Sequence, residues 1–148
     1  MAASRQSRMF RRKKLATVSI TEDGALAVAA ADSERIIIRA NDIETIGFAQ
    51  IGDDTTFVHE GWWLLGLGQT TLAIHADCSS IERALRESPL CATLERLPVK
   101  SLIFFAKRPR LLDTRSGVVV LSHDDAQTLL RTGTARSVPS MDDFPVMT

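Results

Sequence analysis

The sequence predicts an α+β fold built mainly from antiparallel β-sheet, with two short capped helices. Short apolar runs, alternating or β-branched, recur through the first half of the chain and are separated by turn residues such as Asp23-Gly24. Two segments that begin with serine, at Ser79 and Ser122, carry an acidic residue at the third helical position and an apolar stripe. No catalytic constellation is visible between residues 36 and 88, so the pattern favours a binding module over an enzyme.

The composition is that of one globular domain. The chain has 148 residues, of which 45% are hydrophobic and 24% are charged, and these values lie in the ordinary range of globular proteins. We expect a single α+β domain over residues 14–132. A flexible basic arm over residues 1–13 precedes it, and a flexible tail over residues 133–148 follows it.

The net charge is zero, but the charges are unevenly distributed. The first fourteen residues hold six basic side chains and no acidic one, while the remainder holds 12 basic and 18 acidic side chains. A run of like charge is solvated and available to polyanions, including nucleic acid or an anionic membrane surface. These six basic residues are Arg5, Arg8, Arg11, Arg12 and Lys13 of the arm and Lys14, which follows it.

Neither a transmembrane segment nor a disulfide framework is expected. The most apolar window, residues 62–74, is broken by glycines and falls short of the ~20 residues that a spanning helix needs. Cys78 and Cys91 are the two cysteines, and such a low number favours reduced thiols in a cytoplasmic protein.

The order of elements follows from apolar periodicity and turn residues. Strands are expected at residues 15–20, 25–29, 35–39, 43–51, 57–67 and 70–75, and later at 102–106 and 117–121. Gly61 and Gly66 predict a bend or bulge in the fifth strand.

The helices are predicted from their capping residues. Ser79 and Glu82 form a capping box for the first helix, which Pro89 ends. A short helical segment follows over residues 91–97. Ser122 caps the last helix, which runs to Gly133.

His75 and Cys78 form the one cluster in the sequence that suggests a catalytic site. A thiol near a helix N-terminus ionises more readily, and an adjacent imidazole can act as its base, which would make a cryptic hydrolase. The alternative is an ordinary junction between a strand and a helix, because no oxyanion partner is evident. A zinc site could draw on His59, His75, Cys78 and Cys91, but Cys91 stands alone, so we expect no metal and no cofactor.

Trp62 and Trp63 are neighbours in a predicted strand, so their rings face opposite sides of the sheet. One ring belongs in the core. The other lies on the outer face, partly exposed unless the C-terminal segment covers it. Exposed tryptophan is enriched at contact surfaces. Two alternatives therefore remain for the outer ring. It can contact a partner, or it can pack beneath residues 100–132.

Lys107, Arg108 and Arg110 form a second basic cluster, within a predicted turn. Together with the arm, it permits a nucleic-acid-associated protein that contacts phosphates. The predicted sheet lacks the alternation of aromatic and basic residues that a base-stacking platform needs.

Residues 36–46 read as a strand, an Asp-Ile step at Asp42-Ile43, and a second strand that opens with another isoleucine, Ile46. Residues 63–67 and 71–74 then form a hairpin before the first helix. Over residues 15–88 this order resembles bacterial pleckstrin-homology-like (PH-like) domains. The resemblance implies a roll or partly open barrel that binds a protein, a peptide or a lipid headgroup.

Residues 99–131 are similar in element order to the closing segment of some nuclease-related α/β domains. Those enzymes hold a metal ion with an acidic residue and a later Glu-x-Lys motif. This chain contains no Glu-x-Lys, so nuclease chemistry is not expected.

The sequence therefore predicts a non-catalytic binding or regulatory module with a protein or peptide partner, or with a second copy of the chain. The alternatives are a nucleic-acid-associated protein that uses its basic arm and a cryptic hydrolase centred on His75 and Cys78. The expected contact residues are Trp62, Trp63, Arg8, Arg11, Arg12, Lys13, Lys14, Lys107, Arg108 and Arg110.

Overall fold

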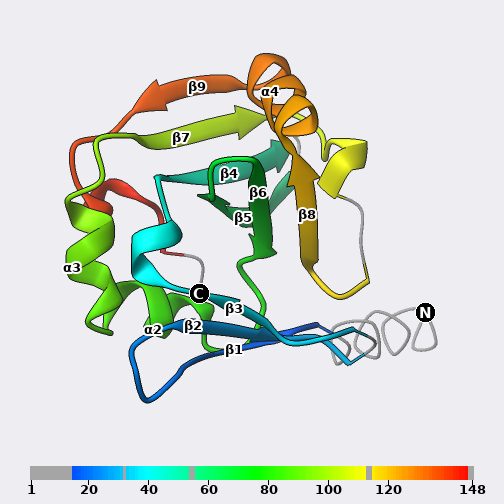
Figure 1. Cartoon of the computed structure of the whole chain (residues 1–148). Coiled ribbons are helices and arrows are strands. Elements are labelled where there is room, and N and C mark those ends of the chain that lie inside the picture. The colour runs from blue at the N-terminus through cyan, green and yellow to red at the C-terminus, as the bar shows by residue number, and fades with distance from the viewer. Residues whose placement is uncertain (1–14, 32, 54–55, 113–114, 147–148) are drawn as a thin grey trace.

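A computed structural model describes residues 15–31, 33–53, 56–112 and 115–146, with side chains omitted for residues 53–59. Within these ranges the protein is α+β, with two open sheets and three α-helices, and neither sheet closes into a barrel (Figure 1). The basic arm expected over residues 1–13 lies outside the described residues.

The smaller sheet is antiparallel, in the order β1-β2-β3. Its strands are β1 (Thr17–Ile20), β2 (Leu26–Ala29) and β3 (Ile36–Ile38). Gly24 turns the chain between β1 and β2 at φ 86°, a left-handed conformation that glycine adopts without strain. The hairpin predicted from Asp23-Gly24 is therefore confirmed.

The larger sheet has the order β8-β6-β5-β4-β7-β9. Its strands are β4 (Thr45–Asp53), β5 (Thr56–Gly66), β6 (Thr70–His75), β7 (Lys100–Phe105), β8 (Val118–Ser122) and β9 (Thr134–Ser137). Neighbours pair antiparallel except β4 and β7, which are parallel. The strands predicted before the first helix all form, and so do those predicted at residues 102–106 and 117–121.

The larger sheet lies between two covering layers (Figure 1). One face packs on the smaller sheet and on α2 (Ile81–Arg86) and α3 (Leu90–Glu95), and the other packs on α4 (His123–Thr132). Along β5, Trp63 and Leu65 enter the first core cluster, whereas Trp62 and Leu64 enter the second. Burial of both faces explains why β5 is apolar without alternation.

The cap predicted for the first helix is wrong. The helix begins at Ile81, after Ser80 at φ 69°, and has no side-chain cap. The carbonyl of Ser79 accepts the N–H of Val18, so Ser79 is held in a bridge to β1. The Glu82 carboxylate binds Arg86 at 2.6 Å instead of turning back to the cap. At α4 the prediction holds, because Ser122 accepts the Asp125 N–H at 3.1 Å.

The bulge predicted at Gly61 and Gly66 is also wrong. Both glycines keep a regular register, opposite Gln50 and Thr45, and the register shifts between Ile51 and Asp53 instead. A Cβ at Gly61 would overlap the ring of Phe48, and one at Gly66 would overlap the side chain of Thr45. These glycines therefore make room for side chains of the neighbouring strand.

The described part of the predicted flexible tail is ordered. β9 pairs with β7, and η3 (Met141–Asp143) follows it. Val138, Met141 and Phe144 are buried in the first core cluster. Two nitrogens of Arg86 donate to the carbonyls of residues 141, 144 and 145 at 3.0–3.1 Å. The sequence of this segment has no local periodicity, and its structure depends on contacts with elements that are distant in the chain.

Candidate binding site

A groove of about 350 Å³ opens between α4 and one corner of the larger sheet. We call it the α4 groove. It exists because α4 contacts β8, β6 and β9, crossing the sheet from one edge to the other. The corner where β4 and β7 begin and β5 ends is left uncovered.

The floor of the groove is apolar and lies close to the backbone. Leu64, Ile103 and Leu129 line it and are buried. Gly47 also lines it, and a Cβ there would lie 3.2 Å from the carbonyl oxygen of Ser101, tighter than an ordinary contact. The lack of a side chain at residue 47 therefore deepens the floor.

The rim of the groove carries exposed apolar side chains. Val99 is 46% exposed and Leu130 is 38% exposed, and both line the groove. Exposed apolar side chains beside a concave apolar floor are typical of a contact site rather than of scattered surface residues.

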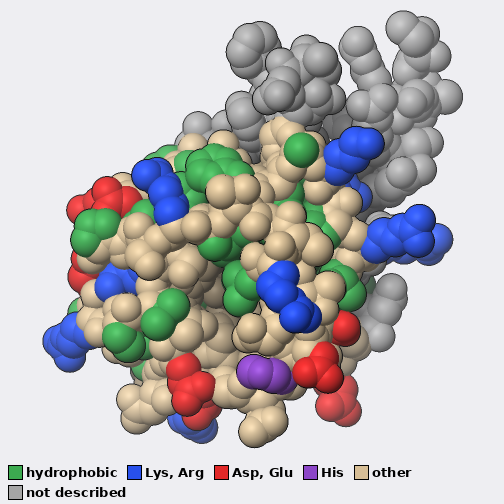
Figure 2. Space-filling model, turned by 90° about the horizontal axis from the view of Figure 1, so that it is seen from above, with side chains coloured by type: hydrophobic (Ala, Val, Ile, Leu, Met, Phe, Trp, Pro, Cys, Tyr) green, Lys and Arg blue, Asp and Glu red, His purple; other side chains and the backbone are tan. Residues whose placement is uncertain are grey.

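Among the described residues, the polar lining of the groove includes a carboxylate but no Lys or Arg side chain. Glu44, His123 and Gln127 line it, and Asp124 and Asp125 follow His123 in the first turn of α4. Figure 2 views the side of the molecule that bears β9, β7 and α4, and shows hydrophobic side chains interspersed with charged ones. At one margin of this view, acidic side chains lie beside a histidine.

Trp62 and Trp63 are not part of this site. Their exposed fractions are 2% and 0%, so neither ring is available to a partner in this structure. Trp63 packs edge-on against Phe48 and Phe144, with centroids 4.9 and 5.4 Å apart. Trp62 lies in the second core cluster together with buried side chains of β7, β8 and α4. Packing under the C-terminal segment, one of the two open alternatives, is what the structure shows.

His75 and Cys78 do not face each other as base and nucleophile. The Nδ1 atom of His75 accepts the N–H of Asp77 at 2.9 Å, and its Nε2 atom lies 3.4 Å from Glu60. The thiol of Cys78 is directed at the carbonyls of Ser116 and Gly117, at 3.8 and 3.7 Å. Burial raises the pKa of Cys78 to about 11, so the thiol is protonated at neutral pH.

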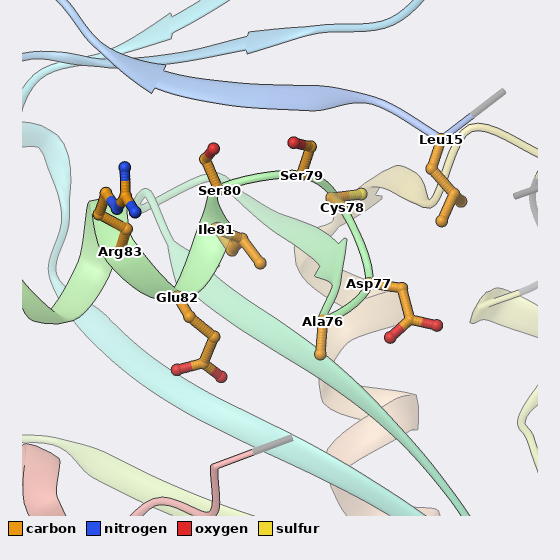
Figure 3. A pocket seen from close by; sticks show the side chains of 9 residues that line it. All are labelled: Leu15, Ala76, Asp77, Cys78, Ser79, Ser80, Ile81, Glu82 and Arg83. Atoms are coloured by element: carbon orange, nitrogen blue, oxygen red, sulfur yellow. The ribbon is translucent and has the colours of Figure 1, made fainter. Parts of the chain in front are cut away.

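A larger but more open pocket of about 610 Å³ surrounds the junction of β6 and α2. Figure 3 shows that its polar side chains diverge. The hydroxyls of Ser79 and Ser80 point to one side, whereas the carboxylates of Asp77 and Glu82 point to the other. These groups do not meet at a point where a reactant could be held.

One residue of the second basic cluster is already paired. Arg108 contacts the carboxylate of Glu60 through two nitrogens, each at 2.7 Å. Burial alone would raise the pKa of Glu60, but hydrogen bonds from His75 and Arg108 outweigh it and lower that pKa to about 2. Lys107 and Arg110 are exposed. The predicted contact residues Arg8, Arg11, Arg12, Lys13 and Lys14 lie outside the described residues.

The described part of the chain has neither a metal-binding cluster nor a membrane-spanning helix. It contains no cluster of three or more His, Cys, Asp or Glu side chains placed to hold a metal ion. The side chain of His59, named above as a zinc-ligand candidate, is not among those described. Within the same residues, no helix combines the length and apolar character needed to cross a membrane.

The comparisons with protein-family models, curated proteins and solved structures found no match in any of the three. The function proposed for this chain is therefore inferred from its own geometry.

The residues of the α4 groove were not predicted as a site from the sequence. Gly47 inside a strand indicates a close approach to the backbone, and Leu130 extends the apolar stripe of α4. Neither pattern specifies where α4 crosses the sheet, so the uncovered corner could not be located from the sequence.

Proposed function

We propose that this protein is a non-catalytic binding module that holds a short apolar segment of a protein or peptide partner in the α4 groove. The proposal rests on one observation: the exposed side chains of Val99 and Leu130 lie beside a buried apolar floor. Val99 and Leu130 are already more than half buried, so covering the exposed part of one of them contributes roughly 0.6–1.4 kcal/mol.

The hydrolase alternative has less support. A nucleophilic cysteine needs a thiolate and a base within reach. The thiol of Cys78 is buried and protonated, and both ring nitrogens of His75 are directed to other groups. Lys107 and Arg110 give limited support to contact with nucleic acid, because Arg108 between them is paired with Glu60.

The PH-like resemblance remains part of the proposal. It is supported by the order of β1 to β6 before α2, although these strands lie in two open sheets. Cys78 and Cys91 are both free thiols, which supports the expected reducing, cytoplasmic location.

The test is selection of short peptides from a random displayed library against the whole protein. We expect apolar peptides whose affinity falls about tenfold or more in Val99→Lys and in Leu130→Lys, because each change places an ammonium group at the rim. Val146→Lys is the matched control, since Val146 is 63% exposed and does not line the groove.

Circular dichroism and the midpoint of urea unfolding establish that each variant is folded. Peptides that bind all three variants as tightly as the unmodified protein would exclude the α4 groove as the contact site. Failure to select any apolar peptide would also count against the proposal.

A further inference from the structure

We propose that β9 is a dimerisation edge, at which two copies of this chain pair β9 with β9, antiparallel, about a twofold axis at Ala135. The inference goes beyond the proposed function, because no residue of β9 lines the α4 groove. It rests on the open backbone of β9, on the register that its residues allow, and on an exposed phenylalanine of the neighbouring strand.

The backbone of β9 is open on one side. β9 is the last strand of the larger sheet and forms its outer edge (Figure 1). The N–H of Val138 donates to the carbonyl of Lys100 at 2.9 Å, so every second residue of β9 bonds β7 in turn. The N–H and C=O groups of Ala135 and Ser137 therefore point away from the sheet. Among the described residues these groups have no hydrogen-bond partner, and both side chains are exposed.

The strand at the opposite edge of the same sheet, β8, is less open. The hydroxyl of Ser116 binds both the N–H and the carbonyl of Val118, at 3.3 and 3.4 Å, and Ser122 caps α4. A strand edge without such protection is a template for pairing with another chain. Of the two edges of the larger sheet, β9 is therefore the one that offers more hydrogen bonds to an added strand.

The residues of β9 favour one twofold register. With Ala135 opposite Ala135 of the second copy, Ser137 faces Gly133, and each of these pairs can exchange two N–H···O bonds. Gly133 has the extended backbone that this needs, at φ −101° and ψ 175°. An axis at Arg136 would set two guanidinium groups directly opposite each other. An axis at Ser137 would place Ala135 opposite Pro139, which has no N–H to donate.

Two further features favour a second copy as the partner. The chain has no net charge at pH 7, so two copies meet without net repulsion. Phe104 of β7 is 42% exposed and lies opposite Thr134, beside the open edge. In the proposed register Arg136 of the second copy lies opposite Thr134, on the same face as Phe104. Its aliphatic stem can therefore cover part of the exposed ring.

The experiment is sedimentation equilibrium of the full chain, with Ala135→Pro as the test and Ala135→Thr as the matched control. Proline removes the outward N–H of residue 135 without removing a hydrogen bond to β7, whereas threonine retains that N–H. We expect the unmodified protein and Ala135→Thr to dimerise. Ala135→Pro should associate at least about tenfold more weakly, because both hydrogen bonds at the axis are lost.

A second readout is disulfide formation in a Cys91→Ser background, which does not require the proline variant to fold. In the proposed register Thr134 of one copy and Arg136 of the other have Cα atoms about 4.5 Å apart, within the range of a disulfide. An equimolar mixture of Thr134→Cys and Arg136→Cys should therefore form a disulfide-linked dimer at least about tenfold faster than either variant alone.

The outcomes separate the two proposals. An unmodified protein that stays monomeric at about 1 mM would overturn the inference and leave the proposed function standing. Unchanged association of Ala135→Pro, shown to be folded by circular dichroism, would also overturn it, and so would equally fast disulfide formation by Arg136→Cys alone. If Ala135→Pro is unfolded, the disulfide result decides. Association that is lost in Leu130→Lys but not in Ala135→Pro would place the second copy in the α4 groove, against this inference and in favour of the proposed function.

Discussion

Replacement of Arg86 by alanine tests how the C-terminal segment is held. The guanidinium of Arg86 donates to the Glu82 carboxylate at 2.6 Å and to the carbonyls of Met141, Phe144 and Pro145 at 3.0–3.1 Å. It also lies over the ring of Trp63, 5.4 Å from its centroid. One side chain therefore joins α2, β5 and the last described residues.

The size of the effect follows from these contacts. Hydrogen bonds from a charged donor contribute about 1.5–3 kcal/mol each, but they are not additive. The Arg86 side chain is 19% exposed, so water can replace part of what is lost. We expect Arg86→Ala to lower the free energy of unfolding by about 3 kcal/mol and the thermal midpoint by about 6–12 °C.

The assay is equilibrium unfolding in urea, with Arg83→Ala as the matched control. Arg83 lies in the same helix, but its side chain is 80% exposed and its partner Glu87 is 3.5 Å away, so we expect a change of less than about 0.5 kcal/mol. A double-mutant cycle with Phe144→Ala should give a coupling of at least about 0.5 kcal/mol. Equal effects of Arg83→Ala and Arg86→Ala, or no coupling, would refute the argument.

Three further predictions follow from side-chain environments. A thiol reagent at neutral pH should modify Cys91 first and Cys78 only after unfolding, because burial raises the pKa of Cys78 to about 11; equal rates would contradict the buried placement. The pKa of Glu60 lies near 2, below its ordinary 4.5, so its contribution to stability is present above pH 4.5 and is lost as pH falls toward 2. Glu60→Gln should therefore flatten the stability profile in acid, and an unchanged profile would exclude the pairing with Arg108. Gly61→Ala should cost about 1–3 kcal/mol in urea unfolding, because a methyl group there overlaps the facing phenyl ring, and a neutral result would show that the ring can move.

Much of the fold could be predicted from local patterns. The alternation of large and small side chains over residues 15–20 predicted β1, and in the structure Val18 is buried between the exposed Thr17 and Ser19. The cap at Ser122 was also predictable, since a serine hydroxyl and the N–H three residues later are close in any helix start. Ser79 has the same pattern, but its pairing with β1 prevents it from capping α2.

The order of the C-terminal segment was not predictable in the same way. Val138, Met141 and Phe144 have no periodic context, and their burial depends on Trp63 and Arg86, which lie far away in the chain. The same holds for the tryptophan pair. The sequence placed the two rings on opposite faces, but the side chains that cover Trp62 come from β7, β8 and α4.

The sequence by itself determined the type and order of strands β1 to β8, the opposite orientation of Trp62 and Trp63, and the separation of charge between arm and body, because each depends on neighbouring residues. The tertiary structure decided which side chains meet. The diagonal path of α4 left Val99 and Leu130 exposed above an apolar corner of the sheet, and separate hydrogen-bond partners directed His75 away from Cys78. These outcomes depend on packing between elements distant in sequence, which no local pattern specifies.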